Sequence, residues 1–365
     1  MASPLRRAAL ALLSSVLALG CAAGGAGRRH AAPPEVAFRE GSVVLGQPDP
    51  DLAAKNDQQL LAIGDAASAS EDHARAAAAF DHLADLHPSS PHHAEALLRS
   101  GLAHRRLGHW EIAAERFRQL ADGPRGRAAD DARLLLAEAL YRQGRRADAR
   151  AVLDALVARA DLPPDQRVRA LADRGVIAID DGDGDAAERS LQAAAAGMEA
   201  TAREQVDPEL WSKIQFHLGE VARARFLVAP LDPAQGGDVL ATRLEEKARL
   251  LLSAQERYFG AIRRGAADWA VAAGARVGEL YDDLYRQLIE APAPADLDAG
   301  QAELYRGELR RTARVLVSKA MGVYEETLSA ARRAGVEHEF VSRTQESLAR
   351  LRGLVEAEGD SEPGG

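Results

Sequence analysis

The chain of 365 residues contains 47% hydrophobic and 28% charged residues, which excludes disorder over most of its length and leaves ample apolar material for a core. Its formal net charge of −9, from 46 basic and 55 acidic residues, gives no electrostatic reason to expect nucleic-acid binding. The only cysteine, Cys21, excludes an internal disulfide and a zinc site built from several thiolates.

Residues 1–21 have the pattern of an export signal. Arg6 and Arg7 precede an apolar run of about twelve residues, from Ala8 to Leu19. A helix that spans a membrane needs about twenty apolar residues. The pattern therefore favours a secretory signal peptide over a membrane-spanning helix.

The end of this segment, Leu17 to Cys21, resembles the lipobox of bacterial lipoproteins, although Ala18 stands where that family most often has leucine. The resemblance implies that Cys21 is lipidated and becomes the first residue of the mature chain. Several acyl chains on one residue would anchor the protein stably. Ala22 is not acidic, which by the same resemblance implies an outer-membrane protein facing the periplasm. An ordinary signal peptide with an unmodified cysteine is the alternative.

Residues 22–56 are rich in Gly, Ala, Pro and Arg and cannot bury enough surface to offset their ordering entropy. We predict that they form a disordered tether. The acidic, glycine-rich segment 356–365 is predicted to be a disordered tail.

Residues 57–200 contain a repeated pattern of small and bulky side chains. A bulky residue follows an alanine by four positions in each unit, so that it lies on the same helical face and fills the groove where two helices cross. We expect a glycine such as Gly64 to end the first helix of a unit. The alanines recur at intervals of 37, 36 and 38 residues: Ala76, Ala113, Ala149 and Ala187.

This pattern resembles the tetratricopeptide repeat (TPR), a pair of helices with a period of about 34 residues. The resemblance implies an all-α protein, a right-handed α-solenoid with about four regular repeats. Residues 207–355 show helical periodicity with longer interruptions, and we predict two divergent repeats and a terminal capping helix there.

The second half also resembles the C-terminal parts of long TPR proteins of myxobacterial type. Trp269, the segments 278–281 and 291–294, and Ala320 with Tyr324 carry this resemblance. Some proteins of that type belong to gliding-motility complexes of the cell envelope.

Candidate chemical sites are weak. The acidic run from Asp180 to Asp185 lacks the glycine and the final glutamate of an EF-hand loop, so we interpret it as a turn in which Asp185 helps to cap the next helix. Seven histidines between His73 and His109 are interpreted as solvated turn residues. No catalytic or phosphate-binding motif is present in the sequence, and we expect neither an enzyme, a cofactor, a metal nor a small-molecule substrate.

The groove of a TPR array is lined by fixed positions of the first helix of each repeat. The lysines and asparagine with which some TPR proteins hold a terminal carboxylate are absent at these positions. The part-apolar groove with arginines at its rim suits an amphipathic or extended protein segment. Simple packing between helices is the alternative for Leu98 and Leu134. The predicted partner-binding residues are Leu98, Leu102, Arg105, Arg106, Leu134, Glu138, Tyr141, Arg142, Val176 and Ile179.

These features predict a non-enzymatic, lipid-anchored scaffold that holds a protein partner in a cell-envelope complex for motility or transport. One alternative is a subunit similar to the lipoprotein of the outer-membrane β-barrel assembly machine, although that family is shorter. A periplasmic enzyme that recruits its partner through the repeats is a further alternative.

Overall fold

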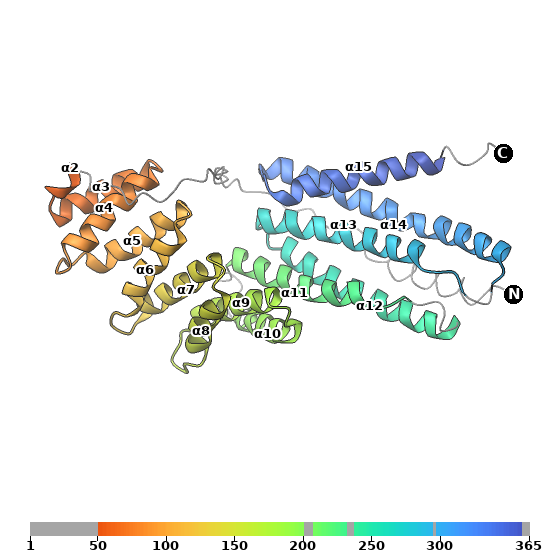
Figure 1. Ribbon diagram of the computed structural model, residues 1–365, viewed down its shortest axis with the longest axis horizontal. Coiled ribbons are helices and arrows are strands. Elements are labelled where there is room, and N and C mark those ends of the chain that lie inside the picture. Colours follow the sequence, from red (N-terminus) through yellow and green to blue (C-terminus); the bar gives the residue numbers. More distant parts are fainter. Residues whose placement is uncertain (1–49, 201–206, 232–236, 295–296, 360–365) are drawn as a thin grey trace. The chain divides into compact units, whose positions relative to one another are not determined.

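The computed structural model describes residues 50–200, 207–231, 237–294 and 297–359. All regular elements within these ranges are helices (Figure 1). The chain divides into two compact units, here called the first unit (described residues up to 200) and the second unit (described residues from 207). None of the described helices combines the length and apolar character needed to cross a membrane. Cys21 lies outside the described residues.

The first unit consists of consecutive helical pairs, and each helix from α3 to α9 packs on the next one in the chain. This arrangement confirms the predicted α-solenoid with four repeats. The pairs are α3 (Asp57–Ala69) with α4 (His73–Leu86), α5 (His93–Arg106) with α6 (Trp110–Ala121), α7 (Arg127–Arg142) with α8 (Arg146–Val157), and α9 (Pro164–Asp180) with α10 (Gly184–Glu199).

Two predicted boundaries of disorder are wrong. A short helix, α2 (Pro50–Ala53), lies within the predicted tether, and the last helix of the chain continues to Gly359, inside the predicted tail. Leu52 explains the first difference, because its side chain is 1% exposed and packs in one core cluster with Leu60 and Leu83. A single buried leucine holds this turn in place, and the amino-acid composition of residues 22–56 does not reveal such a contact.

The crossing of each helical pair depends on direct contact between a small and a bulky residue. A Cβ atom added to Gly64 would lie 2.4 Å from Cε1 of Phe80, and one added to Gly101 would lie 2.5 Å from Cε1 of Phe117. Gly64 thus lies inside α3, and the expectation that it ends the helix is wrong, whereas Gly108, Gly144 and Gly182 do follow the ends of α5, α7 and α9 with positive φ. The role of Gly64 is close approach, since any side chain there would displace the buried Phe80 ring.

Local signals explain where the helices begin and end. Asn56 and Gln59 form a capping box at the start of α3, with Asn56 Oδ1 accepting from the backbone N–H of Gln59 at 2.9 Å. Gly182 ends the turn before α10 with φ of +77°, a conformation that favours glycine. Asp183 caps α10 by accepting from the N–H of Ala186, so the prediction that Asp185 is the cap is off by two residues.

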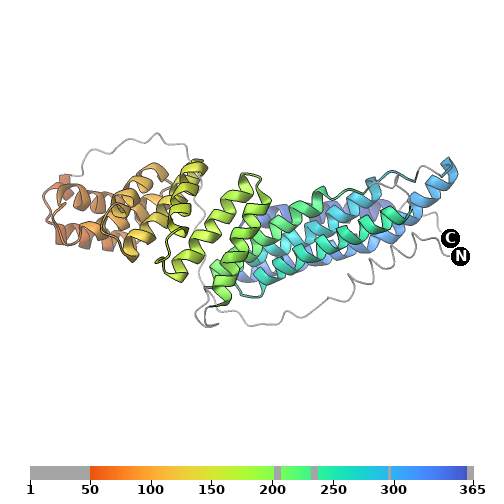
Figure 2. The same ribbon diagram turned by 90° about the horizontal axis from the view of Figure 1, so that it is seen from below.

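The second unit is built from five long helices that lie side by side (Figures 1 and 2). α13 contacts all four of the others and is buried over most of its length between Val271 and Tyr285. The helices are α11 (Pro208–Val228), α12 (Gly237–Ile262), α13 (Ala267–Glu290), α14 (Ala299–Ala334) and α15 (Glu339–Gly359).

The second unit uses the same crossing as the first. A Cβ on Gly278 would lie 2.2 Å from Cε1 of Tyr324, and one on Gly219 would lie 2.5 Å from Cε1 of Tyr258. Ala320, four residues before Tyr324, is fully buried. The pairs α11/α12 and α13/α14 are therefore the two predicted divergent repeats. These repeats are longer: Tyr324 follows Gly278 by 46 residues, whereas Phe80 follows Gly64 by 16 residues in the first repeat.

A buried lysine ties α12 to the end of α11. Lys247 has no exposed surface, and its ammonium group donates to the carbonyl oxygen of Phe226 at 2.8 Å and to that of Ala229. Phe226 lies in the last turn of α11 and Ala229 follows the helix directly, where a carbonyl has no partner within the helix. Burial lowers the pKa of Lys247 to about 8, although Asp283 nearby acts in the opposite direction.

Candidate partner-binding surface

The first helices of the repeats in the first unit, α3, α5, α7 and α9, share a surface, here called the first-helix face. Polar contacts connect its neighbouring helices. Arg105 of α5 forms an ion pair with Glu138 of α7 at 3.4 Å. The hydroxyl of Tyr141 on α7 donates to Asp180 of α9 at 2.5 Å. The predicted residues of α5 and α7 thus come together on one face, as their repeat positions imply.

The apolar residues predicted on this face differ in exposure. Leu134 is 3% exposed and belongs to the core of the first unit, so packing, the alternative we gave for it, explains this residue. Leu98 and Leu102 pack against the same core but keep part of their surface accessible. Val176 and Ile179 of α9 are also partly exposed. These four side chains form the apolar part of the surface that a partner can reach.

Neighbouring side chains hold two of the arginines of the face in place. The guanidinium group of Arg142 lies over the Trp110 ring, 5.6 Å from its centroid, and Arg105 is held by Glu138. Burial, together with the carboxylate of Asp180, raises the pKa of Tyr141 to about 12, so this hydroxyl remains a donor at neutral pH. Arg106 is exposed at the end of α5.

This arrangement can recognise a protein segment by shape and by a few polar anchors. The Arg105–Glu138 ion pair and the Tyr141–Asp180 hydrogen bond hold these side chains in place, which reduces the entropy lost when a partner binds. Accessible leucine, valine and isoleucine provide apolar area, and Tyr141 and Arg142 are of the types enriched at binding hot spots. The face carries charges of both signs and therefore favours a partner with apolar residues between polar ones.

Sequence reasoning missed a polar cluster between the first two repeats. His104 is 6% exposed, and its Nε2 hydrogen-bonds Asp81 of α4 at 2.8 Å. Asp81 also accepts from Ser100 and from Arg116. Burial alone would raise the pKa of Asp81, but the hydrogen bonds and the positive charges around it lower the pKa overall. The interpretation that all seven early histidines are solvated is therefore wrong for His104.

The residue types gave some signal for this cluster. Four polar residues lie on helix faces that also carry apolar residues one turn away, where a polar group without a partner would be costly. They are Asp81, Ser100, His104 and Arg116. In the part of the chain that the structure describes, no group of three or more His, Cys, Asp or Glu residues could hold a metal ion. The cluster joins α4, α5 and α6, and its polar atoms bind one another.

Comparison with known proteins agrees with this geometry. A tetratricopeptide repeat family model matches residues 61–108, 98–163 and 134–203. The segment 61–203 consists of tetratricopeptide repeats. No curated protein matches the sequence.

Solved TPR structures resemble the chain only distantly. A TPR protein from Parabacteroides merdae is 13% identical, with a TM-score of 0.38 over 81% of this chain and 98% of that chain. The C-terminal part of a TPR protein from Cytophaga hutchinsonii is 10% identical, with a TM-score of 0.42 over 84% and 96%. The Rap conjugation gene regulator of plasmid pLS20, solved in complex with the Phr* peptide, is 14% identical, with a TM-score of 0.39 over 87% and 82%.

Proposed function

We propose that this protein is a non-enzymatic scaffold, anchored to the outer membrane by lipid at Cys21, that holds a partner protein on the first-helix face of its TPR array. The host is a cell-envelope complex for motility or transport. TPR repeats support protein binding in general, and the lipobox-like sequence before Cys21 supports the anchor. The resemblance of the second half to myxobacterial TPR proteins supports the choice of complex.

One observation carries the binding proposal. Leu98, Leu102, Val176 and Ile179 remain partly accessible on a face where Arg105 is already paired with Glu138. Full burial of one such side chain contributes about 1.5–3 kcal/mol, so several partly exposed ones can together support a stable contact. The partner we expect is an amphipathic helix or an extended segment with alternating apolar residues.

The partner proposal is tested by crosslinking in intact cells, purification and mass spectrometry. One variant reverses three charges of the first-helix face, Arg105, Arg106 and Arg142, to glutamate. A matched control reverses three exposed arginines elsewhere in the first unit, Arg125, Arg145 and Arg189. We expect a trans-envelope protein to be captured by the wild type and the control and lost from the face variant. Equal capture by both variants would place the binding site elsewhere.

The anchor is tested separately with Cys21→Ser. We expect this variant to lose acyl labelling and to leave the outer-membrane fraction, while its purified form binds the captured partner as the wild type does. Retention in the outer membrane without acyl labelling would contradict the lipid anchor and leave the scaffold proposal standing.

A further inference from the structure

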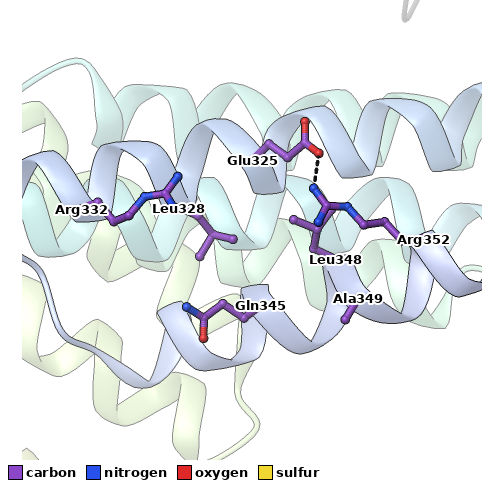
Figure 3. Close-up of a pocket in the computed structure, with 7 residues that line it drawn as sticks. All are labelled: Glu325, Leu328, Arg332, Gln345, Leu348, Ala349 and Arg352. Carbon is purple, nitrogen blue, oxygen red and sulfur yellow. Dashed lines mark hydrogen bonds and ion pairs between the residues drawn. The ribbon is translucent and has the colours of Figure 1, made fainter.

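A groove with a volume of about 340 Å³ runs between α14 and α15 in the second unit (Figure 3). Its lining comes from positions 325, 328 and 332 of α14 and positions 345, 348, 349 and 352 of α15. These spacings of three, four and seven residues place each set on one face of its helix. Seven residues rise about 10.5 Å, so the groove extends over two helical turns.

The groove has an apolar floor. Leu328 and Leu348 line it from opposite helices, and Ala349 leaves room beside them (Figure 3). Leu348 is buried against the core of the unit, whereas Leu328 is partly exposed and Ala349 is exposed. α15 follows the last described helical pair and has no second helix of its own among the described residues. A helix in this groove would pack on α15 as a second helix packs on the first helix of a repeat.

Interior glycines give an independent sign of an incomplete surface. Within the described helices, a Cβ on each of eight glycines would meet a neighbouring side chain at 3.1 Å or less: Gly64, Gly101, Gly175, Gly197, Gly219, Gly260, Gly274 and Gly278. A Cβ on Gly322 of α14 or Gly353 of α15 would meet nothing within 4 Å, as is also true of Gly184 and Gly307. Gly322 lies one turn from Glu325, and Gly353 one turn from Ala349. Both therefore flank the same end of the groove and allow close approach of another helix.

The charges of the groove indicate which charge its occupant carries. Glu325 is already paired with Arg352 at 2.7 Å (Figure 3). Arg332, at the other end, is exposed and forms no ion pair with any residue in the described ranges. The uncompensated charge of the groove is therefore positive.

We propose that this groove is a second docking surface and that its occupant is an amphipathic helix of a partner protein. The helix places aliphatic side chains on Leu328 and Leu348 and a carboxylate against the guanidinium group of Arg332. Spacings of i, i+3 and i+7 on the partner match the two turns that the groove offers. This surface lies wholly within the second unit and does not depend on the first-helix face.

Fluorescence anisotropy of the full chain with a synthetic helical probe tests the proposal. The probe is a stapled peptide of about fourteen residues, with leucines at i, i+3 and i+7 and a glutamate at the end that meets Arg332. A twin probe carries lysine in place of this glutamate. We expect the glutamate probe to bind at least tenfold more tightly than the lysine probe. Equal affinity of the two probes would overturn the assigned charge.

Two variants locate the binding site. Ala349→Arg fills the groove, and Arg332→Glu reverses its free charge; both positions are exposed, so both variants should fold. Each should raise the Kd of the glutamate probe at least tenfold. Arg333→Glu is the matched control, because Arg333 is exposed beside Arg332 and bonds Ser329, and it should change the Kd less than twofold. An equal loss of affinity for the glutamate probe with Arg333→Glu, or no loss of affinity with Ala349→Arg, would overturn the proposal.

Sedimentation of the same proteins tests the main alternative occupant. A wild-type dimer that Ala349→Arg dissociates would identify a second copy of this chain in the groove and would overturn the proposal. A monomer in both cases, with probe binding as predicted, supports it. The Arg105/Arg106/Arg142 variant should bind the glutamate probe normally, which separates a failure of this surface from a failure of the first-helix face.

Discussion

Replacing Gly278 by alanine should destabilise the second unit although alanine is the better helix former. The new Cβ would lie 2.2 Å from Cε1 and 2.4 Å from Cδ1 of Tyr324, a side chain with no exposed surface. Ordinary contact begins near 3.4 Å, so the ring or the backbone must move by about 1 Å. Overpacking of this kind costs about 3 kcal/mol at the upper end, against about 1 kcal/mol gained from helix propensity. The expected net loss is about 2 kcal/mol.

Gly322→Ala is the matched control, because Gly322 lies within α14 in open space and should gain up to about 1 kcal/mol. Because Trp110 lies in the first unit, urea unfolding is followed by tryptophan fluorescence in a Trp110→Phe background, where Trp211 and Trp269 report on the second unit. Tyr324→Leu should partly restore the stability lost in Gly278→Ala. The third repeat has this combination, with Leu153 at the position of Tyr324 and an alanine at the position of Gly278. A Gly278→Ala protein as stable as the wild type, or a double-mutant cycle without coupling, would refute the reasoning.

Two further predictions concern buried charges. Asp130→Ala should lower the free energy of unfolding of the first unit by about 2–3 kcal/mol. Asp130 is 1% exposed, and its removal leaves the guanidinium groups of Arg133 and Arg159 without the carboxylate that they share. Asp161→Asn, at an exposed partner of Arg159, should change the melting temperature little. For Lys247, the pKa of about 8 in the folded state lies below that of the unfolded chain, so the unfolded state binds more protons above pH 8 and stability rises with pH. Between pH 8 and 9.5 the gain in urea unfolding experiments should be about 1.5 kcal/mol for the wild type relative to Lys247→Met; equal slopes for the two proteins would contradict the assignment.

The sequence predicted the helical repeats because their packing is local and periodic. Ala76 and Phe80 lie one turn apart on the same helix, so the face that crosses the preceding helix can be recognised without knowledge of the tertiary structure. The same crossing in the second unit joins Gly278 to Tyr324 across a long insertion, and periodicity alone did not reveal that contact.

The candidate site was predictable in position but not in exposure. Repeat positions placed Arg105 and Tyr141 on one face, and the ion pair and hydrogen bond across it agree. The same positions could not show that Leu134 is buried, since a leucine at a helix interface serves packing and recognition equally well. The Asp81–His104 cluster was missed because its members are 23 residues apart and belong to different helices.

Site-specific photocrosslinking in intact cells tests the central claim, that the first-helix face holds a partner protein. A photoreactive amino acid replaces Ile179 on α9 in one protein and Arg189 on α10, an exposed position of the second helix of the same repeat, in the other. The account predicts a single trans-envelope adduct from position 179, with the crosslinked peptide an amphipathic or extended segment, and no such adduct from position 189. The same adduct from both positions, or an adduct from position 189 alone, would contradict it.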